Sequence, residues 1–205
     1  MWPALLQSLR ADLYRVAAKA GLRAFFTTFL CVATYRYVAL LRLCQAFRRR
    51  PALKWTLYPL LLLWFARLGR KLGIRIPLAC KVGDGLLIEH WGGIWVNPEV
   101  IFGRNCNIAH GVTLGWVGSG ANRGAPQLGD GVFLGPGCAV LGGVKVGNHA
   151  LISANSVVLQ DVPENGVVLG VPGRVFSTQG SHDLVKNPWP EGARSDSPQQ
   201  DASSN

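Results

Sequence analysis

Aliphatic residues recur every six positions between Leu128 and Pro163, and glycine, aspartate and asparagine gather between them. The fifth position of each block is small or branched: Val132, Cys138, Val144, Ala150, Ser156 and Val162. A half-buried strand would alternate with a period of two and an amphipathic helix with a period of 3.6, so a period of six indicates a repeat architecture. The pattern predicts a mainly β protein, a left-handed parallel β-helix whose first and fifth positions point inward.

The same period extends toward the N-terminus with one shift. The earlier blocks begin at Ile76, Val82, Ile88, Val96, Phe102, Ile108 and Leu114. Two extra residues therefore lie between Ile88 and Val96. Three blocks make one coil of such a prism, so His90 and His110, each third in its block, should lie on the same side, about 4.8 Å apart along the axis.

A loop is expected where the period is interrupted a second time. Leu114 and Leu128 are 14 positions apart, which is more than one block, and the excess is rich in glycine. The segment 116–127 is predicted to leave the prism as a flexible loop near the two histidines. Long loops on compact repeats usually serve a site.

Residues 1–73 precede the repeat, and their apolar spacing favours helices. Leu9–Ala20 and Phe25–Phe47 fit amphipathic helices, with breaks at Gly21 and Pro51. A third apolar run, Leu57–Ala66, is shorter than the roughly 20 residues of a membrane span.

The chain is thus divided into three parts. A helical region at 1–73 is followed by a β-helix domain at 74–176. The tail at 177–205 is polar and rich in proline, serine and glutamine, so it is expected to be disordered.

The net charge of +10 belongs to the N-terminal third. Residues 1–75 hold 14 Lys or Arg and one acid, Asp12, whereas residues 76–205 hold 7 and 10. Cations flank the third apolar run: Arg48, Arg49, Arg50, Lys54, Arg67, Arg70 and Lys71. This arrangement fits an anchor on an anionic membrane surface, and equally a helical cap that packs on the prism and on neighbouring subunits. No nucleic-acid-binding motif accompanies the charge, so no nucleic-acid partner is expected.

The five cysteines show neither CxxC nor the spacing of a zinc site. Cys80, Cys106 and Cys138 fall at the fifth position of their blocks, where a small buried residue is expected. Nothing calls for disulfides, and no cleavable signal peptide is recognisable. The expected compartment is the cytoplasm, with a peripheral contact at the inner face of the cell membrane under the anchor hypothesis.

Four segments resemble the hexapeptide-repeat acyltransferases: IEHWGGIWV, NCNIAHGVTLG, NRGAPQLGD and GVPGRVF. The resemblance covers about residues 74–176. It is to the serine acetyltransferase branch, including relatives that acetylate exopolysaccharides such as colanic acid. A hexad ladder alone also fits carbonic anhydrases, but these need three His ligands, and neither His149 nor His182 supplies a convincing third. No metal is therefore expected.

The resemblance implies that His90 is the general base, because serine acetyltransferases have an Asp-His pair where Glu89-His90 stands here. A neutral imidazole near physiological pH suits removal of a hydroxyl proton. Glu89 would orient the ring or stabilise the imidazolium, although adjacent residues on a flat strand point to opposite faces. His110 would act as a base, bind the acceptor hydroxyl or pack beside His90.

The resemblance also implies a homotrimer with acetyl-CoA in the groove between adjacent prisms. By that analogy the lining residues are Gly115, Gly135, Ala139 and Ala154, with Lys145 or Arg174 meeting phosphates. Backbone N–H groups near Gly115 would stabilise an oxyanion. Trp91 and Arg123 are candidates for acceptor binding. Ordinary turn or surface roles remain open for each of these residues.

Two departures from the serine enzymes favour the polysaccharide-modifying relatives. The family's loop usually carries an Arg-His pair that helps to hold serine, whereas here Arg123 precedes Gly124. The long helical domain of the serine enzymes is replaced by the basic, apolar region 1–73. The expected function is therefore acetyl-CoA-dependent O-acetylation of a sugar hydroxyl in exopolysaccharide or envelope glycan biosynthesis. The alternatives are L-serine O-acetylation for cysteine biosynthesis and a non-catalytic trimeric scaffold.

Overall fold

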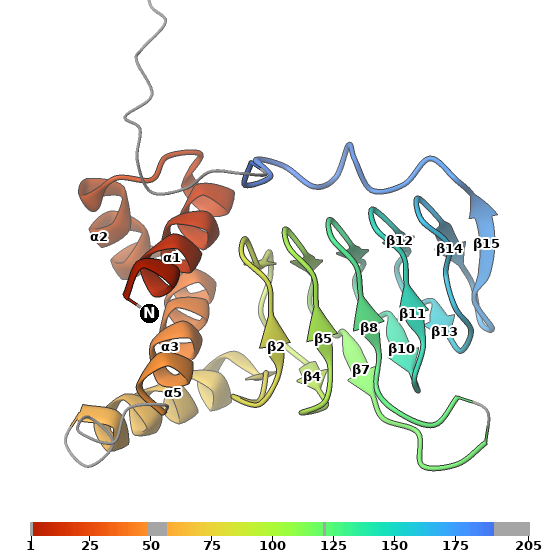
Figure 1. Cartoon of the computed structure of the whole chain (residues 1–205), viewed down its shortest axis with the longest axis horizontal. Coiled ribbons are helices and arrows are strands. Elements are labelled where there is room, and N and C mark those ends of the chain that lie inside the picture. The colour runs from red at the N-terminus through yellow and green to blue at the C-terminus, as the bar shows by residue number, and fades with distance from the viewer. Residues whose placement is uncertain (1, 49–56, 121, 191–205) are drawn as a thin grey trace, which may run out of the picture.

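A computed structural model describes residues 2–48, 57–120 and 122–190. The helices are α1 (Trp2–Ala17), α2 (Leu22–Cys31), α3 (Ala33–Arg48) and α5 (Leu57–Leu72). The strands are β1 (Ile74–Arg75), β2 (Lys81–Val82), β3 (Leu87–Ile88), β4 (Ile94–Val96), β5 (Ile101–Phe102), β6 (Asn107–Ile108), β7 (Thr113–Gly115), β8 (Gln127–Leu128), β9 (Phe133–Leu134), β10 (Ala139–Leu141), β11 (Lys145–Val146), β12 (Leu151–Ile152), β13 (Val157–Val158), β14 (Val167–Leu169) and β15 (Arg174–Ser177). The helices gather at one end of a stack of short strands (Figure 1).

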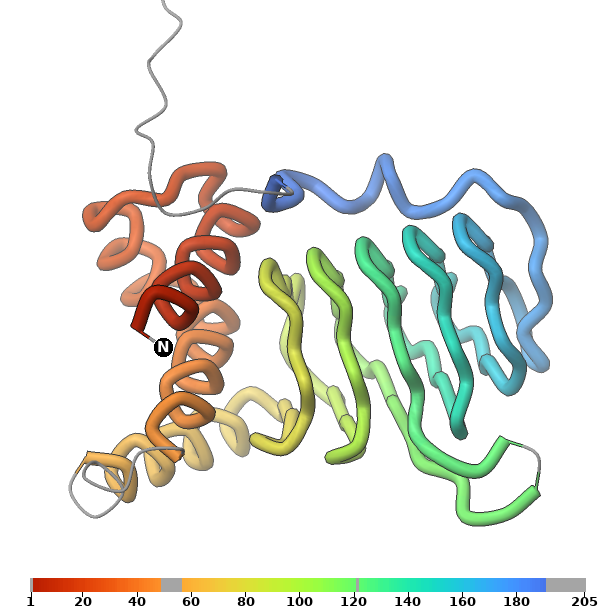
Figure 2. Tube along the Cα trace, in the orientation of Figure 1, coloured from red at the N-terminus to blue at the C-terminus, as the bar shows by residue number. Residues whose placement is uncertain are grey.

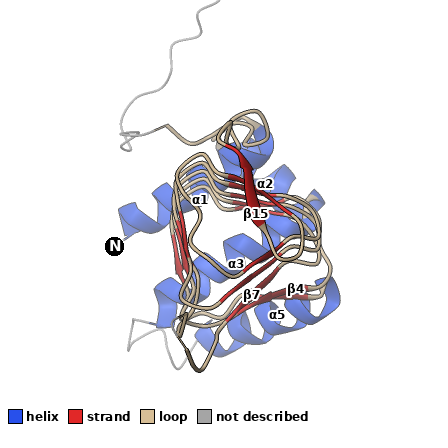
Figure 3. Cartoon of the chain, turned by 90° about the vertical axis from the view of Figure 1, so that its right-hand side faces the viewer, coloured by secondary structure: helices blue, strands red, loops and turns tan. Residues whose placement is uncertain are grey.

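The strands form three sheets that make the sides of a prism with a triangular section (Figure 3). Sheet A has the order β1-β4-β7-β10-β13, sheet B β11-β8-β5-β2 and sheet C β15-β14-β12-β9-β6-β3. All neighbouring strands are parallel except β14 and β15. Successive coils wind through the three sheets in turn, so the predicted parallel β-helix with an N-terminal helical region is confirmed.

The first and fifth positions of the six-residue blocks fill the prism. Ile88, Ile108 and Leu134 stack in sheet C, each 2% exposed or less. Cys106 and Cys138 are fully buried at fifth positions, where a small side chain fits between coils. Coils come so close at the turns that a Cβ on Gly103 would lie 2.4 Å from the backbone of Gly129. The period of six therefore reports the inward direction of each side chain.

The helices differ from the sequence expectation at two points. Helix α1 begins at Trp2 and ends at Ala17, where Leu9–Ala20 was expected. Phe25–Phe47 is not one helix, because α2 and α3 meet at Val32 with a bend of 112°. The Arg36 guanidinium turns back to the end of α2 and donates to the carbonyl oxygens of Phe29 and Leu30. It thus satisfies carbonyls that the ended helix leaves without a partner. The expected break at Pro51 lies outside the described residues.

No single helix in the described ranges is long and apolar enough to cross a membrane. The bent pair of α2 and α3 passes that test of length and composition when its two helices are taken together.

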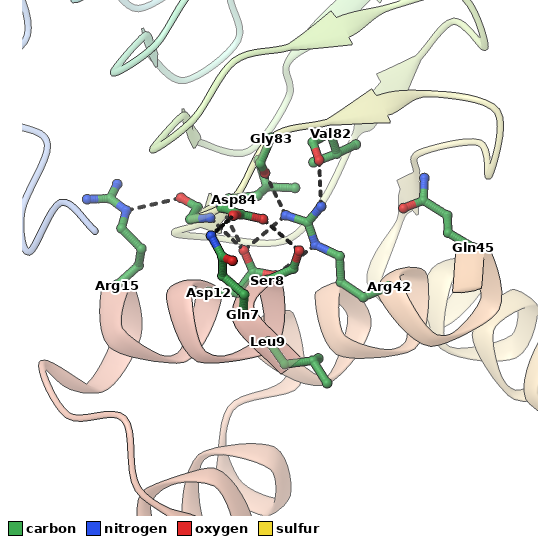
Figure 4. A network of polar contacts seen from close by, with 12 residues as sticks. Gln7, Ser8, Leu9, Asp12, Arg15, Arg42, Gln45, Val82, Gly83 and Asp84 are labelled. Carbon is green, nitrogen blue, oxygen red and sulfur yellow. Dashed lines mark hydrogen bonds and ion pairs between the residues drawn. The ribbon is translucent and has the colours of Figure 1, made fainter. Parts of the chain in front are cut away.

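The helices dock on the first coil through a buried ion pair (Figure 4). Arg42 of α3 donates to both oxygens of Asp12 of α1, at 2.9 and 3.0 Å, and the pair is almost inaccessible to solvent. Arg42 also donates to the carbonyls of Val82 and Gly83 at 2.6 Å. These carbonyls belong to the coil end that has no preceding coil to pair with.

The carboxylate of Asp12 serves the same coil end from the other side. It accepts hydrogen bonds at 2.9 Å from the backbone N–H groups of Gly85 and Leu86. Ser8 of α1 donates to the side chain of Asp84 at 2.6 Å. Helices α1 and α3 therefore replace the missing strand neighbours of the first coil.

The opposite end of the prism is closed by β15 and by a segment that returns to the helices, here called the strap (residues 178–190). The strap runs along the prism from the last coil to the helical end (Figure 2). Ser181 bonds to Gly131 and His149, and the backbone of Trp189 exchanges two hydrogen bonds with the side chain of Asn105. The expectation of a disordered tail therefore does not hold for residues 177–190. Residues 191–205 lie outside the described part.

We predict that Asp12→Ala destabilises the protein by about 3–5 kcal/mol, because it leaves the Arg42 charge buried without its partner. The double variant Asp12→Ala/Arg42→Met should cost less than the sum of the two single variants. Urea unfolding at a fixed protein concentration measures both values. The control is Glu99→Ala on the exposed surface. An equal loss of unfolding free energy in Asp12→Ala and in the control would show that the ion pair does not stabilise the fold.

A chain ending at Ser177 should be less stable than one ending at Pro190. Six hydrogen bonds between the strap and the prism are lost, and two of them, Arg104 to Pro190 and His182 to Asn165, are solvent-exposed. The other four contribute about 1 kcal/mol each, so the difference should be about 2–4 kcal/mol. Thermal and urea unfolding of the two truncated chains test this. Coincident unfolding curves would show that the strap follows the prism without stabilising it.

Candidate functional site

His90 and His110 lie side by side at the corner between sheets C and A. Their ring centroids are 6.1 Å apart and the ring planes make an angle of 68°. Both side chains are exposed. The register pairs Ile88 with Ile108, which places each histidine two residues beyond an aligned pair. The juxtaposition predicted by counting in sixes is confirmed, whereas the chemical roles of the two residues stay predictions.

The two-residue insertion forms the turn that holds His90. Five residues separate β3 from β4, and this turn contains Gly92 and Gly93 at φ of 110° and 66°. Such values are strained for residues with a side chain. The N–H of Gly111 donates to the carbonyl of Gly92 at 2.7 Å, so the turns after the two histidines are bonded to each other. The histidines are thus fixed by backbone geometry.

Glu89 is held by a polar chain that begins in helix α1. Its Oε1 accepts a 2.8 Å hydrogen bond from Nδ2 of Asn107, and Oδ1 of Asn107 accepts from the Arg15 guanidinium. Arg15 also donates to the carbonyls of Gly85 and Lys186. Burial lowers the pKa of Arg15 to about 10, so the guanidinium stays charged at neutral pH.

This network changes the expectation for Glu89. Within the described residues no hydrogen bond joins Glu89 to either imidazole; the carboxylate bonds to Asn107 instead. Glu89 directly follows β3 and reaches Asn107 on the neighbouring strand β6, whereas His90 lies in the turn. Sequence reasoning missed Arg15 and Asn107. The sequence carried no signal for either residue, because the complete burial of Asn107 and its bond to Arg15 are visible only in the structure.

The candidates for binding acetyl-CoA divide between faces of the prism. Gly135 and Ala154 lie at the histidine corner, one and two coils beyond His110. Gly115 and Ala139 lie on sheet A, in β7 and β10. Of these four residues, Gly135 and Ala154 are next to the histidines, whereas Gly115 lies at the far end of β7.

The two candidate phosphate ligands lie elsewhere. Lys145 is exposed on β11 of sheet B, and Arg174 is exposed on β15 at the end of sheet C. Neither belongs to the histidine corner in one chain, so the structure does not bring them to one site with His90.

Trp91 follows His90 and is 59% exposed, as expected for a residue that contacts a ligand or a neighbouring subunit. Trp95 is 53% exposed on β4, and the Arg75 guanidinium lies over its ring at 4.4 Å. Trp116 is 44% exposed. These aromatic faces are available on the surface and are not part of the core.

The loop with Arg123 is placed across sheet A from the histidines. It follows β7, closes through a bridge between Val117 and Gly124, and bonds to Gly143 of a later coil through the carbonyl of Asn122. His110 lies in the turn before β7 and Gly115 ends that strand, so the whole of β7 lies between the histidine and the loop. The expectation that the loop lies near the histidines is therefore not met within one chain. The same separation keeps the N–H groups around Gly115 from the chain's own His110.

The buried cysteines have no nucleophilic character. Burial raises the pKa of Cys106 and of Cys138 to about 12 and that of Cys80 to about 11, so all three are thiols at neutral pH. His149 stacks on His182 at 4.4 Å at the corner between sheets B and C, away from His90. Within the described ranges no group of three or more His, Cys, Asp or Glu could hold a metal ion.

Comparisons with known proteins agree on one family. The family described as bacterial transferase hexapeptide (six repeats) matches residues 125–160. A serine acetyltransferase of Synechococcus elongatus is 39% identical over 108 residues, which are 53% of this chain and 44% of the relative. The soybean serine acetyltransferase apoenzyme has a TM-score of 0.69 and 31% identity, covering 85% of this chain and 69% of that one. A serine acetyltransferase complex with CoA has a TM-score of 0.69 and 27% identity, covering 85% and 70%.

The comparisons overturn the expected closeness to exopolysaccharide O-acetyltransferases and with it the sugar acceptor. Eight curated relatives that are 34–39% identical to this chain are serine acetyltransferases, and so are eight similar solved structures, among them that of Brucella abortus. The missing histidine after Arg123 and the different N-terminal region were therefore misleading signals. The chain spans 33–51% of the length of these curated relatives.

The prism, its period of six and the paired histidines agree with these similarities. Together they show that the chain carries bacterial transferase hexapeptide repeats at residues 125–160 and is similar to the serine acetyltransferases.

Proposed function

We propose that the chain is an acetyl-CoA-dependent L-serine O-acetyltransferase. The observation that supports it most is the pair of exposed imidazoles, His90 and His110, with centroids 6.1 Å apart on a prism similar to serine acetyltransferases. One of those similar structures is a complex with CoA. We further propose that the coils wind left-handed and that three chains form a trimer, as the family resemblance implies.

In this proposal the serine hydroxyl attacks the thioester carbonyl directly. The C–O bond of the acetyl ester forms as the C–S bond breaks, and the serine proton passes to the imidazole of His90. The imidazolium can then return the proton to the departing thiolate of CoA. A positioned neutral imidazole contributes about 10²–10⁴-fold to such a step. No thiol of the core competes as a nucleophile, because the pKa values of Cys106 and Cys138 are raised to about 12.

Small residues at the histidine corner leave room for a ligand along the prism. In register with His110, the next two coils carry Pro136 and the exposed Ala154, and Gly135 beside them has no side chain, so only small groups follow His110 along the corner. Gly135 also has a structural reason, since a Cβ there would lie 2.8 Å from the backbone nitrogen of Ala154. The residues at this corner fit the pantetheine arm of acetyl-CoA. Lys145 and Arg174 lie on other faces of the prism, so they could bind its phosphates only if they came from a neighbouring chain.

A trimer would resolve the separation between the two halves of the site. His90 and His110 lie at the beginning of the strands of sheet A, and the Arg123 loop follows the end of strand β7. A neighbouring prism can place its own loop beside the first chain's histidines. The exposed Trp91 and Trp95 would then lie at the contact between subunits.

The direct test is release of free thiol from acetyl-CoA by the purified full chain. We expect release that depends on L-serine, with much less for L-threonine and none above background for glucose. A thiol reagent follows the rate, and mass spectrometry identifies O-acetylserine. Release with sugar but not with serine, or no acceptor-dependent release, would contradict the proposal.

His90→Ala should lower kcat by about 10²–10⁴-fold, because the proton acceptor is lost. His110→Ala should have a smaller effect or act mainly on KM for serine. The matched control is His149→Ala, which removes an imidazole at a different corner of the same prism. Sedimentation confirms that all three variants keep the assembly state. Retention of most activity in His90→Ala, with loss in His110→Ala, would transfer the role of base to His110.

A further inference from the structure

Helix α5 has an exposed stripe that changes character along its length. Its first half is apolar and 45–66% exposed at Leu57, Leu60, Leu63 and Trp64. The stripe continues at spacings of three and four residues with the exposed cations Arg67, Arg70 and Lys71. The opposite side of the helix is buried. Helix α5 therefore presents an apolar strip that ends in a cluster of positive charges.

Helix α2 adds a second apolar stripe. Leu22, Phe26 and Leu30 follow one another every four residues and are 80, 60 and 70% exposed. Phe29 of α2 contacts Trp64 of α5, with ring centroids 5.9 Å apart. Phe29 is half-buried and lies beside the α2 stripe, so this contact brings the two helices together next to their stripes, at the helical end of the molecule (Figure 1).

A cationic pocket lies at this junction. Its volume is about 480 Å³, and its lining consists of Arg36, Trp64, Arg67, Leu68, Arg70 and Lys71. The ion pair found in the described part of the chain is that of Arg42 with Asp12, so no carboxylate there neutralises the four cations of the pocket. Arg36 is fixed in place by its bonds to the end of α2 and lies 5.8 Å from the ring centroid of Phe29.

We propose that α2 and α5 bind the surface of a bilayer that contains anionic phospholipid. The exposed Leu and Phe side chains enter the boundary between headgroups and acyl chains, and the pocket receives a lipid phosphate. Apolar stripes next to unpaired cations are the composition of interfacial helices. The α5 stripe is too short to span a membrane, so the contact is peripheral.

Charge argues against a two-fold contact with a second copy of the chain at this surface. A two-fold contact would place the same patch of each copy face to face. The cations of two pockets would then approach one another without acids between them. An anionic bilayer complements this charge, and it complements the excess of 14 cations over one acid in residues 1–75 as well.

The experiment measures co-sedimentation of the full chain with vesicles of phosphatidylcholine containing about a third phosphatidylglycerol. We expect binding to these vesicles and none to vesicles of pure phosphatidylcholine. Binding should fall steeply between 0.1 and 0.5 M salt, because the Debye length shortens over this range from about 10 Å to a few ångströms. Arg67→Gln/Arg70→Gln should weaken binding about 25-fold, since each cation near the surface contributes about fivefold. Leu60→Gln/Leu63→Gln should weaken it by about tenfold or more through loss of apolar burial.

The control is Lys81→Gln/Lys145→Gln, which removes the same charge from exposed positions on the prism. It should bind vesicles within about twofold of the unchanged chain. Equal losses for the two charge variants, equal binding to neutral and anionic vesicles, or no binding at all would overturn the proposal. Loss of an oligomeric contact in Leu60→Gln/Leu63→Gln, seen by sedimentation without vesicles, would assign the surface to a second copy instead and would equally overturn it.

Discussion

A β-helix must satisfy the backbone groups at its open ends, and the buried pair of Asp12 and Arg42 does this for the first coil. Inside the stack each coil bonds to the next, but the turn at Val82–Leu86 has no earlier coil. Two charges in the interior are costly unless their remaining bonds are satisfied. Here the remaining bonds of Asp12 and Arg42 go to the backbone groups that the first coil leaves unpaired. The same hydrogen bonds therefore compensate both the burial of the two charges and the missing neighbouring coil. The basic helical region is thus an end cap of the prism, whatever else its outer surface does.

The cap and the candidate site share one buried network. Arg15 of α1 reaches Asn107, and Asn107 holds the carboxylate of Glu89, the residue before His90. The strap joins the same point, because Arg15 also bonds to the carbonyl of Lys186. The first coil therefore receives hydrogen bonds from α1 and α3, and Arg15 links this end of the prism to the strap. This is the coil in which the insertion shapes the turn of His90.

The period of six predicted what depends on side-chain direction alone. It gave the prism, the buried cysteines and the meeting of His90 with His110, since every coil repeats the same geometry. It could not predict the bend between α2 and α3, which depends on Arg36 reaching carbonyls before it in sequence. Nor could it predict the strap, because polar composition is uninformative when hydrogen bonds to Gly131 and Asn105 hold the segment. The partner of Glu89 was hidden for a similar reason: Arg15 lies 92 residues from Asn107.

The geometry of one prism also explains why sequence neighbours do not make a complete site here. His110 and the loop of Arg123 are close along the chain, but β7 stands between them, and an extended strand separates its ends by about 3.3 Å per residue. The histidines lie where the strands of sheet A begin, and the loop of Arg123 lies where they end. The face of the sheet between them bears the exposed Trp95. A second prism laid along this face would bring a loop to the histidines and cover the indole at once. The repeat therefore fixes the histidines within one chain, and the acceptor side of the proposed reaction depends on how chains meet.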